Sequence, residues 1–305
     1  MNPAEWGLLV LLSVLWGSAF FFVGVAVIEV PPLTIALARV GIASLLLLAL
    51  ISFLGYSLPR SLTEWTPFLV MGLLNNVLPF SFLNMGQTMI SVGLASIING
   101  MTPLFTALVM ASFREERLTV HRVTGVLLGV AGVMLISLPD MAAGNARLLG
   151  IGLCLAGALS FGFAALWGRR HLMDIPPLKT ATCQLLSSTC IMMVVVVPVE
   201  RPWTLPAPGM ETWLALIGLA LFGTAVAYVV FFEILARAGA SNVMLVTLLI
   251  PVTALLLGSL FLAEPLIWHE LAGAAIIGLG LLFIDGRLPR RVKYAALARY
   301  SCRHR

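Results

Sequence analysis

Apolar runs of about twenty residues recur along the whole chain, and this pattern excludes most folds before any motif is considered. The chain has 305 residues, of which 60% are hydrophobic and only 10% are charged. Soluble proteins are about 45–50% apolar and about 25% charged. A soluble domain, a disordered chain and a disulfide scaffold are therefore excluded, and we expect an all-α polytopic membrane protein.

The apolar runs predict ten transmembrane helices. A spanning helix needs about 20 mostly apolar residues, and turns rich in proline or polar residues separate most of the runs. The weakest boundary follows Gln87, where we expect a tight hairpin between the third and fourth helices. The expected spans are Trp6–Val27, Leu33–Phe53, Trp65–Gln87, Ser91–Phe113, His121–Leu138, Leu148–Gly168, Leu178–Val197, Glu211–Glu233, Ser241–Ala263 and Trp268–Asp285.

Lysine and arginine cluster beside the apolar runs in a pattern that predicts the orientation of the chain. With the N-terminus in the cytoplasm, fifteen of the 18 Lys and Arg residues lie inside, Arg147 and Arg201 lie outside, and Arg39 lies within a span. Cytoplasmic loops carry an excess of Lys and Arg, so we expect both termini of a ten-span chain in the cytoplasm. Because the basic residues lie beside the apolar runs, the pI of about 9.4 indicates contact with the membrane surface and not with nucleic acid.

Two sequence motifs recur at nearly constant offsets. Residues 29–33 (EVPPL) are echoed by residues 174–178 (DIPPL) at an offset of 145, which places Arg39 opposite Gln184. Residues 102–116 match residues 250–264 at an offset of 148, and each copy has a proline thirteen residues before a glutamate. Two such matches with nearly equal offsets predict that the chain consists of two homologous halves.

The two halves are expected to have opposite orientations in the membrane. Each contains five expected spans, an odd number, and the three arginines after the fourth span have no counterpart in residues 264–270. We therefore predict two inverted five-helix repeats, residues 1–139 and 140–286, followed by a basic cytoplasmic tail, residues 287–305. This arrangement is typical of secondary transporters, whose substrate site lies near the membrane midplane where the repeats meet.

Several short motifs in a fixed order carry a resemblance to a known family. They are residues 15–20 (LWGSAF), 36–39 (ALAR), 93–96 (GLAS), 102–105 (TPLF), 115–118 (EERL) and 223–228 (GTAVAY), with Pro251 followed by residues 264–265 (EP). In these motifs and their spacing the chain resembles the EamA-type transporters of the drug/metabolite transporter superfamily, over about residues 6–286. The resemblance implies export or exchange of small metabolites, often amino acids, across a bacterial inner membrane.

Arg39 is the one basic residue inside an expected span, about two helical turns from its start. A charged side chain at this depth costs at least about 2.5–3.5 kcal/mol on insertion scales. One interpretation is that the side chain extends to the nearer interface; the other is that it binds a carboxylate or another anion in a cavity. Because no acidic residue lies at mid-depth in any expected span, an anionic or zwitterionic ligand is favoured.

Five amide side chains are further candidates for substrate contact. They are Asn75, Asn76 and Asn84 in the third expected span, Asn99 in the fourth and Gln184 in the seventh. Asn76 and Asn84 are eight residues apart and can share one helix face. The alternative is that such amides join neighbouring helices, through hydrogen bonds worth about 0.6 kcal/mol on average.

Trp16, Phe80 and Tyr228 are candidates for the walls of a substrate cavity, although aromatic residues in such a chain also face lipid or pack in the core.

Three prolines, Pro79, Pro103 and Pro251, fall inside expected spans, where each frees a carbonyl and can kink its helix. Pro103 and Pro251 correspond in the two halves. We expect these prolines to be hinges or cavity-lining breaks, and a static kink is the alternative.

The sequence offers no basis for catalysis within the membrane. A membrane enzyme needs a nucleophile with a base, or a metal cluster, at depth, whereas all four histidines lie in loops, at span ends or in the tail. We therefore expect no enzymatic activity, no catalytic residue, no metal and no cofactor. No carboxylate is well placed for proton coupling either, which favours facilitated or weakly coupled transport.

These observations together predict a multi-pass inner-membrane transporter that exports a small metabolite, an amino acid or a related amphipathic compound, by alternating access through a cavity between the repeats. A multidrug exporter of cationic compounds is the alternative, with a membrane-embedded enzyme far behind. The expected partners are a small-molecule substrate and the lipid bilayer. Small-residue pairs in the fifth and tenth spans fit either a homodimer face or packing within a monomer.

Overall fold

The computed structural model describes residues 2–117, 119–141, 146–243 and 245–284, and the predicted tail, residues 287–305, lies outside these ranges. All regular secondary structure in the described ranges is helical. The first half of the chain contains α1 (Pro3–Ala26), α2 (Pro32–Phe53), α3 (Leu62–Gly72), η1 (Leu73–Val77), α4 (Leu78–Gln87), α5 (Val92–Asn99), α6 (Thr102–Ser112) and α7 (Val120–Met141).

The second half repeats this order of elements. It contains α8 (Ala146–His171), α9 (Pro177–Val199), the short η2 (Pro202–Thr204), α10 (Met210–Ala220), η3 (Leu221–Val226), α11 (Ala227–Ala238), α12 (Ala240–Val243), α13 (Val246–Phe261) and α14 (Trp268–Ile284). Helices α2 and α9 both begin at the second proline of a Pro-Pro pair, since proline suits the first helical turn, where its missing N–H costs nothing. The starts of α2 and α9 thus keep the offset of 145 that the sequence motifs show.

The apolar runs form helices, and most of these have the length of a membrane span. Eight helical segments within the described ranges are long and apolar enough to cross a membrane. The last two expected spans correspond to α13 and α14, whose described lengths of 16 and 17 residues are shorter. The polytopic membrane fold is therefore established, while the count of ten spans stays a prediction.

The predicted hairpin between the third and fourth spans is present. Residues 88–91 turn the chain from α4 into α5. The Ser91 hydroxyl then accepts a hydrogen bond from the Leu94 N–H at 3.2 Å and thereby caps the first turn of α5. A serine cap is enough to start a new helix here without a long loop.

Two long helices are interrupted by a π-helical turn at matching positions. Turn η1 separates α3 from α4, and turn η3, which begins 148 residues later, separates α10 from α11. Pro79 lies two residues after the end of η1 and has no N–H for a regular helical bond, which accounts for the first interruption. The residue at the matching position, Ala227, gives no such reason for η3. Turns of this kind are often found at functional sites.

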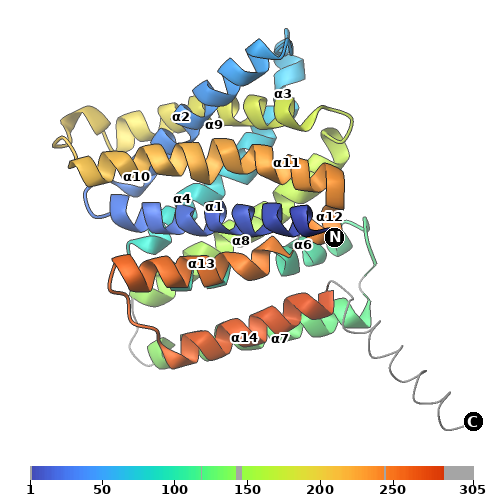
Figure 1. The fold of residues 1–305 in the computed structure, drawn as a ribbon, viewed down its shortest axis with the longest axis vertical. Helices are drawn as coiled ribbons and strands as arrows, with labels where there is room; N and C mark the ends of the chain where they lie inside the picture. Colours follow the sequence, from blue (N-terminus) through green and yellow to red (C-terminus); the bar gives the residue numbers. More distant parts are fainter. Residues whose placement is uncertain (1, 118, 142–145, 244, 285–305) are drawn as a thin grey trace, which may run out of the picture.

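The helices lie side by side, with α7 and α14 as a separate pair at one edge of the bundle, at the bottom of the view in Figure 1. Glycines allow the close approach of this pair: a Cβ added to Gly125 would lie 2.6 Å from the Gly280 carbonyl, and one added to Gly132 would lie 2.7 Å from the Gly273 carbonyl. Gly125 thus serves packing within one chain. Because small residues let backbones approach closely in membranes, this pair needs no polar contact to associate.

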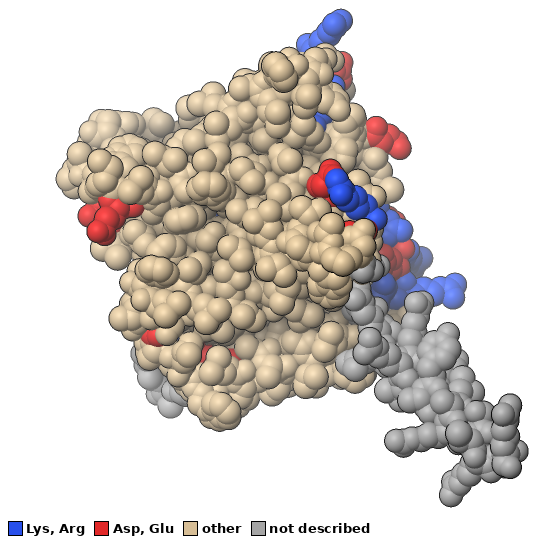
Figure 2. Space-filling model, viewed as in Figure 1, with Lys and Arg blue, Asp and Glu red and all other residues tan. Residues whose placement is uncertain are grey.

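Charged side chains gather at two opposite ends of the molecule. Figure 2 shows most Lys and Arg residues at the right edge, acidic side chains also at the left edge, and a broad uncharged belt between them. The belt carries many exposed aliphatic and aromatic side chains, as expected for a surface in contact with lipid.

Candidate functional site

A cavity of about 390 Å³ lies in the centre of the bundle and is lined by both halves of the chain. Its volume is within the range of small-molecule sites, which are clefts of about 300–1,000 Å³. The lining is mostly apolar, with a few polar side chains. The residues around it are Trp16, Ala19, Phe20, Val23, Arg39, Met71, Asn75, Phe80, Leu83, Asn84, Gln87, Asn99, Thr102, Pro103, Thr106, Phe161, Ala165, Thr180, Gln184, Gly223, Thr224, Tyr228, Phe231, Phe232, Val243, Val246, Thr247 and Ile250.

Arg39 points from α2 into this cavity toward the π-helical turn η3. Its Nε donates to the Thr224 hydroxyl at 2.9 Å, and its Nη2 donates to the Gly223 carbonyl at 3.2 Å. The guanidinium carbon lies 3.7 Å from the centre of the Phe80 ring, which is a cation–π contact. A guanidinium has five N–H donors, so three of them have no protein acceptor in the described part of the chain. No ion pair to Arg39 is found there either.

The packing of α2 against α9 explains why Arg39 faces the cavity. Ala36, Val40 and Ala43 form an apolar stripe on α2 that packs with Ala181 and Leu185 of α9. Arg39 lies off this stripe, which leaves its side chain on the cavity side. The small residues of the stripe bring the two helices close together and so fix the position of the guanidinium.

A hydrogen-bonded network of neutral groups surrounds Tyr228, which also lines the cavity and lies four residues after the Thr224 that Arg39 contacts. The Tyr228 hydroxyl accepts from Asn75 Nδ2 at 3.2 Å and from Gln184 Nε2 at 3.2 Å, and donates to Asn76 Oδ1 at 3.3 Å. Asn76 Nδ2 in turn donates to Ser188 Oγ at 2.9 Å. The network joins η1, α9 and α11, so it fixes the wall of the cavity as well as its polarity.

Four oxygen atoms that line the cavity are buried without a hydrogen-bond partner in the described ranges. They are the side-chain oxygens of Gln87, Asn99, Gln184 and Thr180. A buried polar atom without a partner costs about 1–3 kcal/mol, so these atoms are available to a ligand that brings N–H or O–H groups. The cavity thus offers one positive group and several neutral acceptors.

Aromatic rings form much of the remaining wall. Trp16 packs against Phe231 with 5.5 Å between ring centroids, and Phe80 meets Phe161 edge-on at 6.4 Å. Tyr228 stacks with Phe232 at 6.1 Å. These rings give the cavity an apolar body between its polar groups, which suits an amphipathic ligand.

Most of the residues predicted as substrate contacts lie at the cavity. Eight of the nine line it: Trp16, Arg39, Asn75, Phe80, Asn84, Asn99, Gln184 and Tyr228. Asn76 does not line it and is fully buried in the Tyr228 network. Asn84 lines the cavity and also donates to the Pro32 carbonyl at 3.0 Å. Their placement makes them candidates, and their role in binding remains a prediction.

The three prolines differ in their surroundings. Pro103 lines the cavity in the first turn of α6, directly after the break between α5 and α6. Pro79 follows η1 and is buried. Pro251 lies inside the continuous helix α13 and is not among the residues that line the cavity. Pro103 and Pro251 therefore correspond in sequence, but only Pro103 lies beside a break in its helix. A hinge role for any of the three prolines stays a prediction.

Sequence reasoning missed several residues of the cavity. Gly223 and Thr224 belong to a family motif, but their contact with Arg39 depends on the π-helical turn, which no simple sequence pattern predicts. Gln87 and Thr180 lie close to the ends of expected spans, where polar residues are common and carry little signal. Phe161 and Phe231 are two aromatic residues among many in apolar helices.

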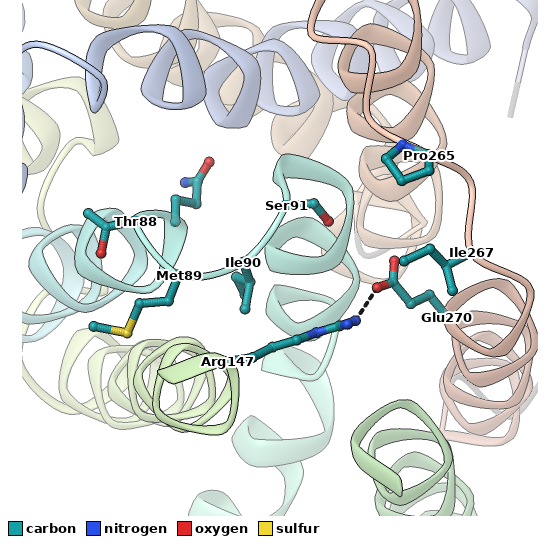
Figure 3. Close-up of a pocket in the computed structure, with 9 residues that line it drawn as sticks. Thr88, Met89, Ile90, Ser91, Arg147, Pro265, Ile267 and Glu270 are labelled. Carbon is teal, nitrogen blue, oxygen red and sulfur yellow. Dashed lines mark hydrogen bonds and ion pairs between the residues drawn. The ribbon is translucent and has the colours of Figure 1, made fainter. Parts of the chain in front are cut away.

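A second pocket of about 270 Å³ lies at one end of the bundle, between the α4–α5 turn and the starts of α8 and α14. Figure 3 shows Arg147 of α8 extending toward Glu270 of α14, with which it forms an ion pair. Glu270 is buried in the first turn of α14, and sequence reasoning did not single it out. Gln87 lines both pockets.

No group of three or more His, Cys, Asp or Glu side chains that could hold a metal ion is found among the described residues. The free cysteines Cys154 and Cys183 are buried, and Cys190 is exposed. The polar groups of the central cavity suit binding of a ligand.

Several known proteins with similar sequences are named as transporters. An uncharacterized transporter of Archaeoglobus fulgidus is 28% identical over 282 residues, which cover 92% of this chain and 98% of that protein. The uncharacterized inner membrane transporter YedA of Escherichia coli is 27% identical over 261 residues, which cover 83% of this chain and 81% of YedA.

The fold is also similar to one solved by crystallography. A crystal structure described only as that of a protein superposes with a TM-score of 0.65 at 19% identity, and the match covers 96% of this chain and 99% of the other. At this identity the likeness concerns the fold alone. The profile of the EamA-like transporter family matches residues 5–138 and again residues 148–285. The chain therefore belongs to the EamA-like transporter family.

Proposed function

We propose that this protein exports a small amphipathic carboxylate, with amino acids as the main class, through the central cavity by alternating access. The observation that carries the proposal is Arg39, a cation inside an aromatic-lined cavity with three N–H groups available to a ligand. A guanidinium matches a carboxylate in bidentate geometry. The buried oxygens of Asn99, Gln184 and Thr180 would accept hydrogen bonds from an amino group.

The repeated order of elements supports alternating access. The π-helical turns begin at residues 73 and 221, and α7 and α14 begin at residues 120 and 268, an offset of 148 in both cases. The family profile also matches the chain twice. Two inverted repeats around a central site, residues 1–139 and 140–286, are the arrangement in which one repeat can move against the other.

The charges support an orientation for transport. The arginine-rich end of the bundle would face the cytoplasm, according to the positive-inside rule. The Escherichia coli relative is named an inner membrane transporter, which supports placing this protein in a bacterial inner membrane with both termini inside. Export as the direction rests on the family resemblance.

A thermal-unfolding screen of the purified protein in detergent tests the proposal. The compounds are the amino acids, simple carboxylates, nucleosides and lipophilic cations. A ligand at one hundred times its Kd stabilises the folded state by about 2.7 kcal/mol, which a shift in Tm resolves. We expect stabilisation by amino acids or carboxylates in the parent protein and its loss in Arg39→Ala.

Arg60→Ala is the matched control, because Arg60 is an exposed arginine at the end of the bundle and is absent from the cavity. It should leave the shift unchanged. Stabilisation by cations alone, unaffected by Arg39→Ala, would instead favour an exporter of cationic compounds that binds to the aromatic walls. Stabilisation by carboxylates that persists in Arg39→Ala would place the binding site elsewhere.

A further inference from the structure

Three glutamates at one end of the bundle each cap the start of a helix from the opposite half of the chain. Glu29 follows α1 and binds the start of α10; Glu200 follows α9 and binds the start of α2; Glu264 follows α13 and binds the start of α5. We call these contacts the three glutamate clamps. In Figure 1 this end lies at the left, opposite the N-terminus.

Each clamp consists of two or three hydrogen bonds. Glu200 accepts from the Leu33 N–H at 3.1 Å, the Thr34 N–H at 2.6 Å and the Thr34 hydroxyl at 2.7 Å. Glu29 Oε2 accepts from the Gly209 N–H at 2.8 Å and the Thr212 hydroxyl at 2.7 Å.

Glu264 accepts from the Val92 N–H at 2.8 Å and the Gly93 N–H at 3.3 Å. Like the other two clamps, it joins the two halves of the chain. A carboxylate at a helix start satisfies free N–H groups and interacts favourably with the helix dipole.

The clamps join helices that line the cavity or lead into its lining. Each of α1, α2, α5, α9 and α13 contributes a residue to the lining, and α10 leads directly into η3, which lines it as well. Separation of the two halves at this end therefore requires that the clamps break.

At the opposite end of the bundle, no glutamate in the described ranges caps a helix start of the other half. The two halves are joined there by ion pairs, which include Arg170 with Glu115 at 2.7 Å. Glu116, which corresponds to Glu264 at the offset of 148, forms ion pairs with Arg122 at 2.6 Å and Arg169 at 2.9 Å. Asp174, which corresponds to Glu29 at the offset of 145, is exposed and has no hydrogen bond or ion pair there. Ion pairs between partly exposed side chains contribute little stability. The two ends are thus joined by different kinds of contact, capped helix starts at one end and partly exposed ion pairs at the other.

We propose that the three glutamate clamps form the gate at the end of the cavity remote from the arginines, and that this gate is closed in the present structure. The proposal rests on the proposed transport function, since a gate matters only if a substrate passes it. Opening at this end would release Glu29, Glu200 and Glu264 from the helix starts, and neutral side chains at these positions should favour the open state.

Cysteine accessibility tests the gate without any ligand. The reporter is Val23→Cys, in a chain whose four native cysteines are replaced by alanine, because Val23 lines the cavity close to the glutamate end of α1. Labelling by a membrane-impermeant maleimide is measured from each side of oriented membrane vesicles. From the glutamate side we expect slow labelling in this parent and roughly ten- to hundredfold faster labelling in Glu29→Gln/Glu200→Gln, because hydrogen bonds to a charged group contribute about that factor.

Glu211→Gln is the matched control, since Glu211 lies in the first turn of α10 at the same end and forms none of the clamp contacts. Unchanged labelling in Glu29→Gln/Glu200→Gln, or an equal increase in Glu211→Gln, would overturn the gate. Should the double variant fail to fold, Thr34→Val and Thr212→Val each remove one hydroxyl donor of a clamp and should increase labelling by a smaller factor.

The outcome for the gate is separable from that for the proposed substrate. If amino acids and carboxylates fail to stabilise the parent protein while the clamp variants still increase labelling, the gate stands and the substrate class is wrong. If these ligands stabilise the protein while labelling is unchanged in the clamp variants, the transport site stands and the gate is wrong.

Discussion

Arg39 and Gln184 occupy corresponding places in the two halves of the molecule, yet they give the cavity opposite chemical properties. Each lies seven residues after the proline that begins its helix, α2 or α9. Arg39 contacts η3 and the face of Phe80, whereas Gln184 donates to Tyr228, which corresponds to Phe80 at the offset of 148.

The repeated scaffold thus holds one cationic corner, around Arg39, and one neutral corner, around Gln184. A symmetric cavity would bind a ligand in two equivalent orientations. With this difference, we expect the carboxylate of a ligand to lie near Arg39 and its hydrogen-bond donors near the amide oxygen of Gln184. The scaffold is therefore repeated in this protein, while the chemistry of its two corners differs.

A variant in which both corners are neutral should show the most severe loss of binding. In Arg39→Gln we expect the affinity for carboxylate ligands to fall about a hundredfold, because charge-assisted hydrogen bonds to the guanidinium are lost. Titration calorimetry in detergent measures this. The exchange variant Arg39→Gln/Gln184→Arg restores one cation and should regain part of the affinity. An unchanged affinity in Arg39→Gln would refute the asymmetric site.

The packing beside the neutral corner offers the next largest effect. A Cβ on Gly72 would lie 2.7 Å from the Gln184 carbonyl and 2.8 Å from Ser188 Oγ. Gly72→Ala should therefore push α3 away from α9 and lower the free energy of unfolding by about 1–3 kcal/mol. The control is Gly152→Ala, where no atom lies within 4 Å of the added carbon. Equal thermal stability of the two variants would contradict the tight packing.

The hydroxyl that distinguishes Tyr228 from Phe80 should have a smaller effect. Tyr228→Phe removes the group that joins Asn75, Asn76 and Gln184. Hydrogen bonds between membrane helices contribute about 0.6 kcal/mol on average, so we expect a loss of about 1 kcal/mol in stability. Unfolding in detergent measures it, with Phe232→Leu as a variant that removes the stacked ring but leaves the network intact. No loss in Tyr228→Phe would show that the network does not hold this corner.

The pH dependence of thermal stability should show a still smaller difference between the two ends of the bundle. Hydrogen bonds from the Thr212 hydroxyl and then the Gly209 N–H hold the pKa of Glu29 below its ordinary value. A carboxyl with a lowered folded-state pKa stabilises the protein above the pKa of the unfolded chain, and this contribution is lost as the pH falls through the lowered pKa.

The difference in Tm between the parent and Glu29→Gln should therefore be constant from neutral pH to the ordinary range of glutamate and vanish below it. Asp174→Asn, at the corresponding position of the opposite end, should leave Tm unchanged at neutral pH. A Glu29→Gln difference that persists in strong acid would mean that the ionised carboxylate is not the stabilising group.

Much of the fold could be predicted from the sequence because the bilayer restricts what an apolar run can form. The helices and their starts are indicated by the apolar runs, the Pro-Pro pairs and the Ser91 turn. Arg39 could be identified as a candidate because a charge inside an apolar run has few explanations. These inferences depend on local composition alone.

The remaining features depend on contacts between distant residues. Sequence gave no reason to expect η3, because Ala227 has no property that would interrupt a helix, and so the contact of Thr224 with Arg39 was missed. The clamps by Glu29 and Glu200 were missed because a glutamate in a loop is ordinary until its helix partner is known. The burial of Glu270 also depends on a distant residue, Arg147, with which it forms an ion pair.

The π-helical turns have a consequence for the fit of this protein to its membrane. The segments that contain them, Leu62–Gln87 and Met210–Ala238, have 26 and 29 residues. At 1.5 Å per residue such helices would be about 39 and 44 Å long, against a hydrocarbon core of about 30 Å. They must tilt or bend, and a π-helical turn is where a helix bends most easily. Because η1 and η3 also carry Asn75 and Gly223, we expect a change in lipid chain length to alter the binding cavity before it disturbs the rest of the bundle.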